Sequence, residues 1–116
     1  MLEMCYSSGE GVAQDQAEAV RLYRLAVAQG YAPAQYSLGS MLHNGEGVAQ
    51  DHAEAVRLYR LAVAQGLAEA QYNLGIMFEF GRGVAQDRAE AIRWYRLAAA
   101  QGYADASAAL NELGAA

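Results

Sequence analysis

Lysine is absent from this 116-residue chain, and cysteine and proline each occur once. Without lysine the chain has neither a Schiff-base amine nor the lysine of a phosphate-binding loop. The single Cys5 cannot form a disulfide within the chain, which fits a reducing compartment. No stretch approaches the roughly 20 apolar residues of a membrane span, and the first ten residues lack the features of a signal peptide. The sequence therefore predicts a cytoplasmic protein with no membrane partner.

Basic residues are also few. The eight arginines are outnumbered by 13 carboxylates, so the net charge is −5. Because phosphate binding needs a basic face, this balance argues against a nucleic-acid partner. The only histidines, His43 and His52, lie nine residues apart without a cysteine or carboxylate at a metal-binding spacing, and no serine lies in a nucleophile motif. We therefore predict no catalytic residue, no metal site and no cofactor, and interpret the chain as not an enzyme.

What the chain does have is a repeat of 36 residues. The segment GVAQD occurs at 11–15, 47–51 and 83–87, and residues 11–46 differ from 47–82 at nine of 36 positions. Such a period is typical of solenoids, in which each unit buries its apolar face against its neighbours. We divide the chain, as one domain over 1–116, into a partial repeat at 1–31, full repeats at 32–67 and 68–103, and a terminal half-repeat at 104–116.

Each repeat is predicted to contain two helices. The first runs from 68 to 80 and stops at Gly81; the second begins after Asp87, an N-cap whose helix carries Glu90 in its first turn. An Asp-x-x-Glu capping box would also let the glutamate accept from the N–H of the cap residue. We expect the same arrangement in all three copies, which makes GVAQD a connector with Asp15 and Asp51 as the other caps. Gly30, Gly66 and Gly102 are expected to end the second helices in a left-handed conformation.

These residues carry a family resemblance. In residues 68–103 the chain reads A-x-A-Q-Y-x-L-G-x-M, then G-x-G-V-x-x-D, then A-x-x-W-Y-x-x-A-A-x-x-G. The pattern resembles the Sel-one-like repeat (SLR) family, relatives of the tetratricopeptide repeats (TPR). The resemblance implies an all-α fold, a right-handed α-solenoid of antiparallel helix pairs, and a non-catalytic scaffold or adaptor role in protein complexes. Some bacterial members bind penicillin-like compounds, but they staple each repeat with a disulfide, and this chain lacks the paired cysteines.

Differences between the two full repeats indicate where a partner binds. They include positions 33, 37, 40 and 44 in one copy and 69, 73, 76 and 80 in the other, spacings that trace one stripe on a helix. In solenoids of this kind the first helices line the concave face, so we interpret the stripe and its neighbours as the binding surface. The alternative is that these positions simply face solvent. The candidate residues are Tyr36, Ser37, Ser40, His43, Asn44, Glu69, Tyr72, Asn73, Ile76, Glu79 and Phe80.

Three other interpretations stay open. Arginines recur on the second helices, and those at 21, 57 and 93 each follow a glutamate by three residues, which favours a solvated convex face over an anionic docking site. Open repeat ends would allow the chain to stack on itself. The high identity between repeats is also compatible with a designed consensus protein that has no natural partner. A penicillin-binding or β-lactamase-like activity is the outside alternative.

Overall fold

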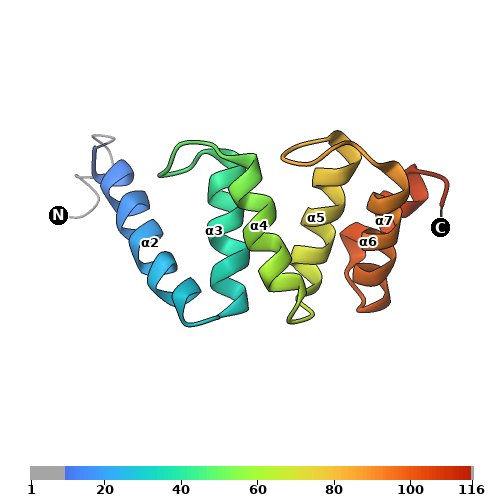
Figure 1. Cartoon of the computed structure of the whole chain (residues 1–116), viewed down its shortest axis with the longest axis horizontal. Helices are drawn as coiled ribbons and strands as arrows, with labels where there is room; N and C mark the ends of the chain where they lie inside the picture. Colours follow the sequence, from blue (N-terminus) through green and yellow to red (C-terminus); the bar gives the residue numbers. More distant parts are fainter. Residues whose placement is uncertain (1–9, 116) are drawn as a thin grey trace.

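The computed structural model describes residues 10–115, with side chains from residue 16 onward. Every regular element in this part of the chain is an α-helix, as the sequence predicts. The helices are α2 (Glu10–Ala28), α3 (Ala32–Asn44), α4 (His52–Val63), α5 (Ala68–Phe80), α6 (Arg88–Ala100) and α7 (Ala104–Glu112). They follow one another along an elongated molecule of 50 × 29 × 27 Å, with α2 and α7 at opposite ends of its long axis (Figure 1).

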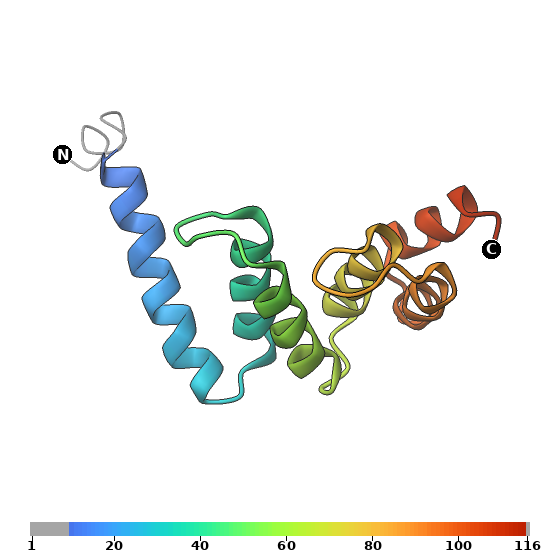
Figure 2. The same cartoon turned by 45° about the horizontal axis from the view of Figure 1, so that its top comes forward.

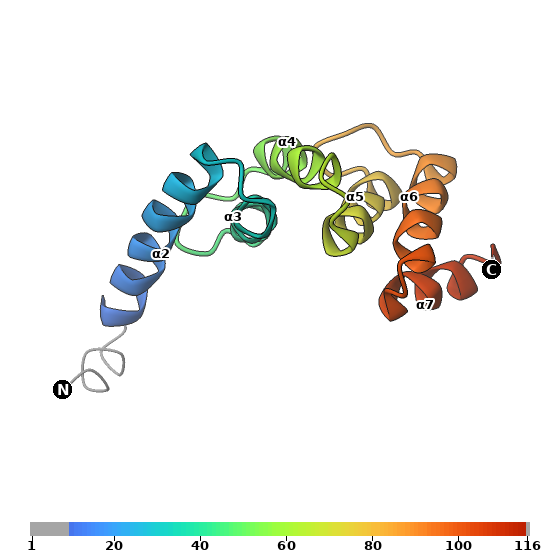
Figure 3. The same ribbon diagram turned by 90° about the horizontal axis from the view of Figure 1, so that it is seen from below.

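The helices form an arch. Seen from below, α3, α5 and α7 lie toward its inside and α2, α4 and α6 toward its outside (Figure 3). We call these two sets the inner helices and the outer helices. The connectors 45–51 and 81–87 lie along one edge of the arch, and the short turns between an outer helix and the next inner helix lie along the other (Figures 1 and 2). The first helix of each predicted repeat is therefore on the concave side.

Both full connectors are anchored by the caps that the sequence predicts. The Asp51 and Asp87 side chains accept from the backbone N–H groups of Glu54 and Glu90, at 3.0 and 3.1 Å. The prediction that the glutamate accepts from the N–H of the cap residue is wrong. The N–H of Asp87 donates instead to the carbonyl of Phe78 at 2.9 Å, and Asp51 does the same to Leu42. Since the end of the inner helix already satisfies that N–H, the glutamate is left available for other partners.

The first GVAQD contradicts the prediction of a connector. Residues 11–15 lie within α2, which starts at Glu10, so the backbone of Asp15 is helical and does not occupy a cap position. In the other copies the connector is held by the end of an inner helix, where Gly45 and Gly81 adopt left-handed φ angles of 73° and 68°. The equivalent inner helix of the first copy would lie among residues outside the described range. The five residues alone do not stop a helix.

Glycines on the inner helices allow the helix pairs to approach closely. A Cβ atom added at Gly39 would lie 2.8 Å from Cε1 of Tyr59, and one added at Gly75 would lie 2.6 Å from Cε1 of Tyr95. These distances are shorter than any van der Waals contact, so a side chain at either position would displace the tyrosine ring. Tyr59 and Tyr95 are almost completely buried, so they are packing residues of the core.

The apolar core consists of two clusters. One extends from Val20 in α2 to Met77 in α5 and includes Leu38, Leu58 and Tyr59, all at most 6% exposed. The other joins α6 to α7 through residues such as Tyr95 and Leu110. Phe78 of α5 packs against both clusters. The core is therefore a chain of neighbouring contacts along the arch, which is the arrangement that defines a solenoid.

Glutamine side chains connect successive repeats. Gln101, at the end of α6, donates to the carbonyl of Gly66 and to Oε1 of Gln71, both at 2.9 Å. Gln65, which lies 36 residues before Gln101, makes the equivalent two bonds to Gly30 and Gln35. Gln35 and Gln71 are buried away from water, so these bonds satisfy side-chain amides that would otherwise lack a hydrogen-bond partner. No buried side-chain nitrogen or oxygen in the described part of the chain lacks a hydrogen-bond partner.

Candidate functional site

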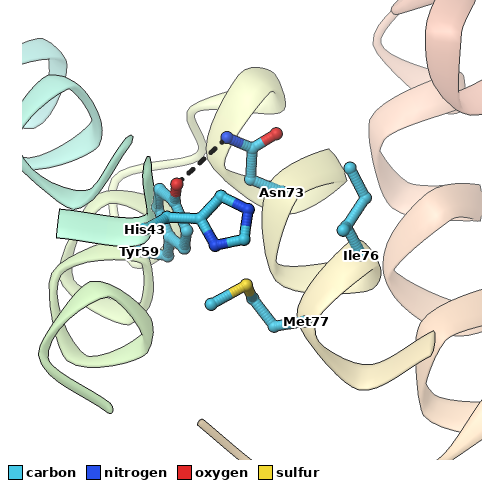
Figure 4. A pocket seen from close by; sticks show the side chains of 5 residues that line it. All are labelled: His43, Tyr59, Asn73, Ile76 and Met77. Atoms are coloured by element: carbon cyan, nitrogen blue, oxygen red, sulfur yellow. Dashed lines mark hydrogen bonds between the residues drawn. The ribbon is translucent and has the colours of Figure 1, made fainter. Parts of the chain in front are cut away.

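A small pocket opens between α3, α4 and α5, within the predicted stripe (Figure 4). Its volume is about 40 Å³, and it is neither fully enclosed nor flat. A site of that size holds a few water molecules or the end of one side chain. Its lining residues are His43, Tyr59, Asn73, Ile76 and Met77. Three of these residues come from the sequence prediction, and the other two, Tyr59 and Met77, are buried residues of the first core cluster.

The Tyr59 hydroxyl is the polar centre of this pocket. It accepts from Nδ2 of Asn73 at 3.2 Å and shares a hydrogen bond of 3.3 Å with Oγ of Ser40. These residues come from α4, α5 and α3, so the phenol ties two inner helices to the outer helix between them. Burial raises the pKa of Tyr59 above the usual value for a phenol, which keeps it neutral and able to donate or accept.

Two histidines meet beside the pocket. Nδ1 of His43, in the last turn of α3, lies 3.2 Å from Nδ1 of His52, the first residue of α4. For this hydrogen bond one ring must donate from Nδ1 while the other accepts, so the pair cannot persist with both rings charged. Burial lowers the pKa of His43, and the neighbouring His52 and Arg82 lower it further. His52 was not among the site residues predicted from the sequence. The signal that was missed is that His43 and His52 flank the same connector, whose two ends lie side by side.

The equivalent position one repeat on has different chemistry. Tyr95 donates its hydroxyl hydrogen to Oε1 of Glu79 at 2.6 Å, where Tyr59 contacts Ser40 and Asn73. Burial raises the pKa of Tyr95, and its bond to the Glu79 carboxylate raises it further. The neighbouring Tyr72 ring lies 5.6 Å from Tyr95 and 5.3 Å from Tyr103, measured between ring centroids. The same fold position is thus neutral at one junction and acidic at the next.

The remaining predicted residues are only partly brought together. Tyr36 packs beside Tyr59, with ring centroids 6.2 Å apart. Ser37 and Glu69 are half-buried on the inner helices, and Asn44 is exposed at the end of α3. Phe80 is 56% exposed, and the Arg82 guanidinium lies 5.4 Å from its ring centroid.

Ile76 behaves differently from Phe80, although the two lie one turn apart. Its side chain lines the pocket but also packs against the second core cluster. The two candidate residues therefore have different surroundings. Ile76 meets the next repeat, and Phe80 is the large apolar side chain that α5 presents to solvent.

The outer helices carry self-contained ion pairs. Arg21, Arg57 and Arg93 bind Glu18, Glu54 and Glu90, with Nε donating at 3.3, 3.0 and 3.3 Å respectively. Hydrogen bonding to arginine lowers the pKa of each glutamate. These contacts agree with a solvated outer face on which these three positive charges are paired.

Neither a metal-ligand cluster nor a membrane span is found in the described residues. No three His, Cys, Asp or Glu side chains lie close enough together to hold a metal ion. No helix between residues 10 and 115 combines the length and the apolar character needed to cross a bilayer. What the inner face offers instead is a shallow pocket, hydrogen-bonding groups and aromatic rings, which suit recognition of another molecule.

Comparison with known proteins identifies the repeat. A family model for the Sel1 repeat matches residues 1–31, 32–67 and 68–103. The chain belongs to the Sel1 repeat family. Sel1 repeat proteins are generally non-catalytic helical scaffolds that bind protein partners. No curated protein sequence matches the chain.

Solved Sel1 repeat structures share the fold. A Sel1 repeat protein from Oxalobacter formigenes is 40% identical, with a TM-score of 0.78, and the match covers 96% of this chain and 84% of that one. The c5321 protein of uropathogenic Escherichia coli, a protective antigen with an SLR fold, is 38% identical with a TM-score of 0.76. That match covers 97% of this chain but only 28% of the antigen. Cysteine rich protein B of Helicobacter pylori, at 17% identity and a TM-score of 0.72, with 94% of each chain covered, shows the common fold alone.

Proposed function

We propose that this chain is a non-catalytic scaffold that binds a peptide or protein segment along its inner face. The observation that carries the proposal is the pocket at the α3–α5 junction, since it lies where two otherwise similar repeats differ in sequence. His43, Asn73 and Ile76 line it, and Phe80 is exposed on the same helix as Asn73 and Ile76. An exposed aromatic side chain near a pocket with hydrogen-bonding groups is a typical anchor point for a partner.

A matched pair of variants tests this proposal. Phe80→Ser removes the exposed ring from an inner helix, and Leu97→Ser removes a leucine of 41% exposure from an outer helix. With the intact chain as bait, we expect captured partners to be lost with Phe80→Ser and retained with Leu97→Ser. Circular dichroism of both variants verifies that the helices persist. Retention of the partners by Phe80→Ser, or their loss with Leu97→Ser alone, would place binding away from the inner face.

A second candidate function, self-association, rests on α2. Leu22 and Leu25 are 52% and 57% exposed, whereas Leu58, at the position of Leu22 one repeat on, is fully buried. Two apolar side chains of this kind on one helix are a potential contact between copies. Light scattering over a range of concentrations tests the idea: a mass that rises with concentration in the intact chain but not in Leu22→Arg supports it, and a constant monomer mass rejects it.

A further inference from the structure

Charge is divided unequally between the two faces of the arch. The inner helices contain four carboxylates and no arginine: Glu69, Glu79, Asp105 and Glu112. Seven of the eight arginines belong to the outer helices, and Arg82 lies in a connector. The three ion pairs found among residues 16–115 are all on the outer helices. Three of the seven outer arginines are therefore paired with glutamates, while the inner helices carry four carboxylates and no arginine to neutralise them.

Several of the inner carboxylates lie near one pair of aromatic side chains, Tyr72 and Tyr103. Tyr72 of α5 stacks in a tilted arrangement against Tyr103, at the start of α7. Burial raises the pKa of Tyr72, and the negative charges of Asp105, Glu112 and Glu79 raise it further. Carboxylates of α5 and α7 therefore lie close enough to influence Tyr72, whose ring packs against Tyr103. Aromatic faces flanked by carboxylates bind guanidinium or ammonium groups through cation–π contacts and charged hydrogen bonds.

The two junctions of the inner face also differ in a consistent direction. The neutral residues His43, Asn73 and Ile76 line the pocket at the α3–α5 junction. The residues 36 positions later are Glu79, Ala109 and Glu112. Two of these three changes add a carboxylate. A ligand that crosses both junctions therefore meets a neutral pocket first and an acidic, aromatic surface second.

We propose that the inner face binds an extended protein segment that carries arginine or lysine, with the basic side chain against Tyr72 and Tyr103 and a neutral or apolar side chain in the pocket beside Tyr59. The proposal rests on the proposed function, because it specifies the chemistry of the partner at the same face. Charge complementarity selects this occupant. A second copy of the chain does not fit as well, because it would present either its own acidic inner helices or outer helices on which Arg21, Arg57 and Arg93 are already paired with glutamates.

Synthetic peptides test the proposal directly. Three fluorescent 12-residue peptides share a neutral Leu/Ser/Gly background and carry either four arginines, four glutamines or four glutamates at the same positions. Binding is measured by fluorescence anisotropy at low and high salt, and the contact region by hydrogen exchange of the intact chain. We expect the arginine peptide to bind about tenfold or more tightly than the other two and to protect α5 and α7, with the preference weakening in high salt.

Two double variants of equal net charge distinguish a specific binding site from non-specific attraction of the basic peptide to the acidic chain. Asp105→Asn with Glu112→Gln removes two inner carboxylates, and Glu18→Gln with Glu46→Gln removes one from an outer helix and one from a connector. The inner variant should lose most of the arginine preference, and the matched variant should keep it. Equal weakening by both variants would mean non-specific attraction and would overturn the proposal.

The remaining outcomes separate this proposal from the proposed function. If the glutamine and glutamate peptides bind as tightly as the arginine peptide and protect the inner helices, the inner face remains the binding face but the basic partner is rejected. If no peptide protects the inner helices, the basic partner is also rejected. The Phe80→Ser and Leu97→Ser comparison then decides the proposed function independently.

Discussion

At the scale of single residues, the contact between His43 and His52 has no counterpart one repeat on, where Glu79 and Arg88 occupy the same positions. A shared hydrogen bond between two imidazoles holds only while at least one ring is neutral. Helix dipoles add a difference between the two, since a positive charge is favoured at the end of α3 and disfavoured at the start of α4. The pair therefore makes the α3–α4 hairpin sensitive to pH.

We expect the stability of the chain to fall as pH decreases from 7.5 to 5.5. The pKa of His43 in the folded protein is lowered from its usual 6.5, so the unfolded chain takes up a proton first. Stability is therefore complete above pH 6.5 and is lost as pH falls toward the folded pKa. The groups that face His43 are His52 and Arg82, both of which disfavour its charged form. Urea unfolding should show a loss of no more than roughly 1 kcal/mol, the net value of one hydrogen bond.

The next repeat supplies the control for this prediction. The double variant His43→Glu, His52→Arg introduces the residues found at 79 and 88. Its stability should be nearly independent of pH between 5.5 and 7.5, because carboxylates titrate mainly below this range. A slope that persists in the variant would assign the pH dependence to other groups.

Single residues also mark the limit of what the sequence predicts about the site. Helical spacing placed the variable positions on one stripe of the first helix, because that spacing depends only on the local sequence. The assignment of this stripe to the inner face came from the family resemblance. The contacts of the Tyr59 hydroxyl with Ser40 and Asn73 were not predicted, since they depend on how three helices pack. Likewise, the local pattern could not separate the half-buried Ile76 from the exposed Phe80, because the neighbouring repeat determines the burial of each.

At the scale of helices, the same five residues have two conformations. GVAQD is a connector at 47–51 and 83–87 but part of α2 at 11–15. The bounds of α5 were predicted as found, because Gly81 provides a strong stop signal within the local sequence. The start of α2 was not predicted as found, because the two connectors are held by bonds from the cap N–H groups of Asp51 and Asp87 to Leu42 and Phe78, and these bonds depend on packing that the five residues do not encode. Local capping signals therefore act only where packing supports them.

This difference predicts unequal effects of one substitution. Asp51→Ala and Asp87→Ala each remove an observed N-cap and should destabilise the chain by about 1 kcal/mol. Asp15→Ala changes a residue whose backbone is already helical, and alanine is the better helix former, so it should be neutral or slightly stabilising. Thermal unfolding followed by circular dichroism distinguishes the three variants. A cost for Asp15→Ala equal to the other two would show that the first copy is capped like the rest.

At the scale of the whole molecule, each helix is stabilised mainly by packing against the helices next to it in sequence. The cluster from α2 to α5 and the cluster of α6 and α7 meet at α5, which contributes side chains to both. Helices that are not neighbours in sequence share few contacts, so a change at one end has little direct effect on the other. The inner face is assembled from successive inner helices, and its acidic part lies near the α7 end of the arch.

We therefore expect a substitution at the end of the arch to act locally. Leu110→Ala removes a side chain of 6% exposure from α7, and Leu74→Ala removes a fully buried one from the central cluster. Each deletes similar apolar volume, which typically costs about 2–5 kcal/mol in a packed core. Hydrogen exchange of Leu110→Ala should accelerate in α6 and α7 while α3 and α4 keep their protection, whereas Leu74→Ala should accelerate exchange throughout α3 to α6. Faster exchange in α3 with Leu110→Ala would mean that the chain unfolds as one cooperative unit, because coupling between repeats would then exceed the stability of each repeat.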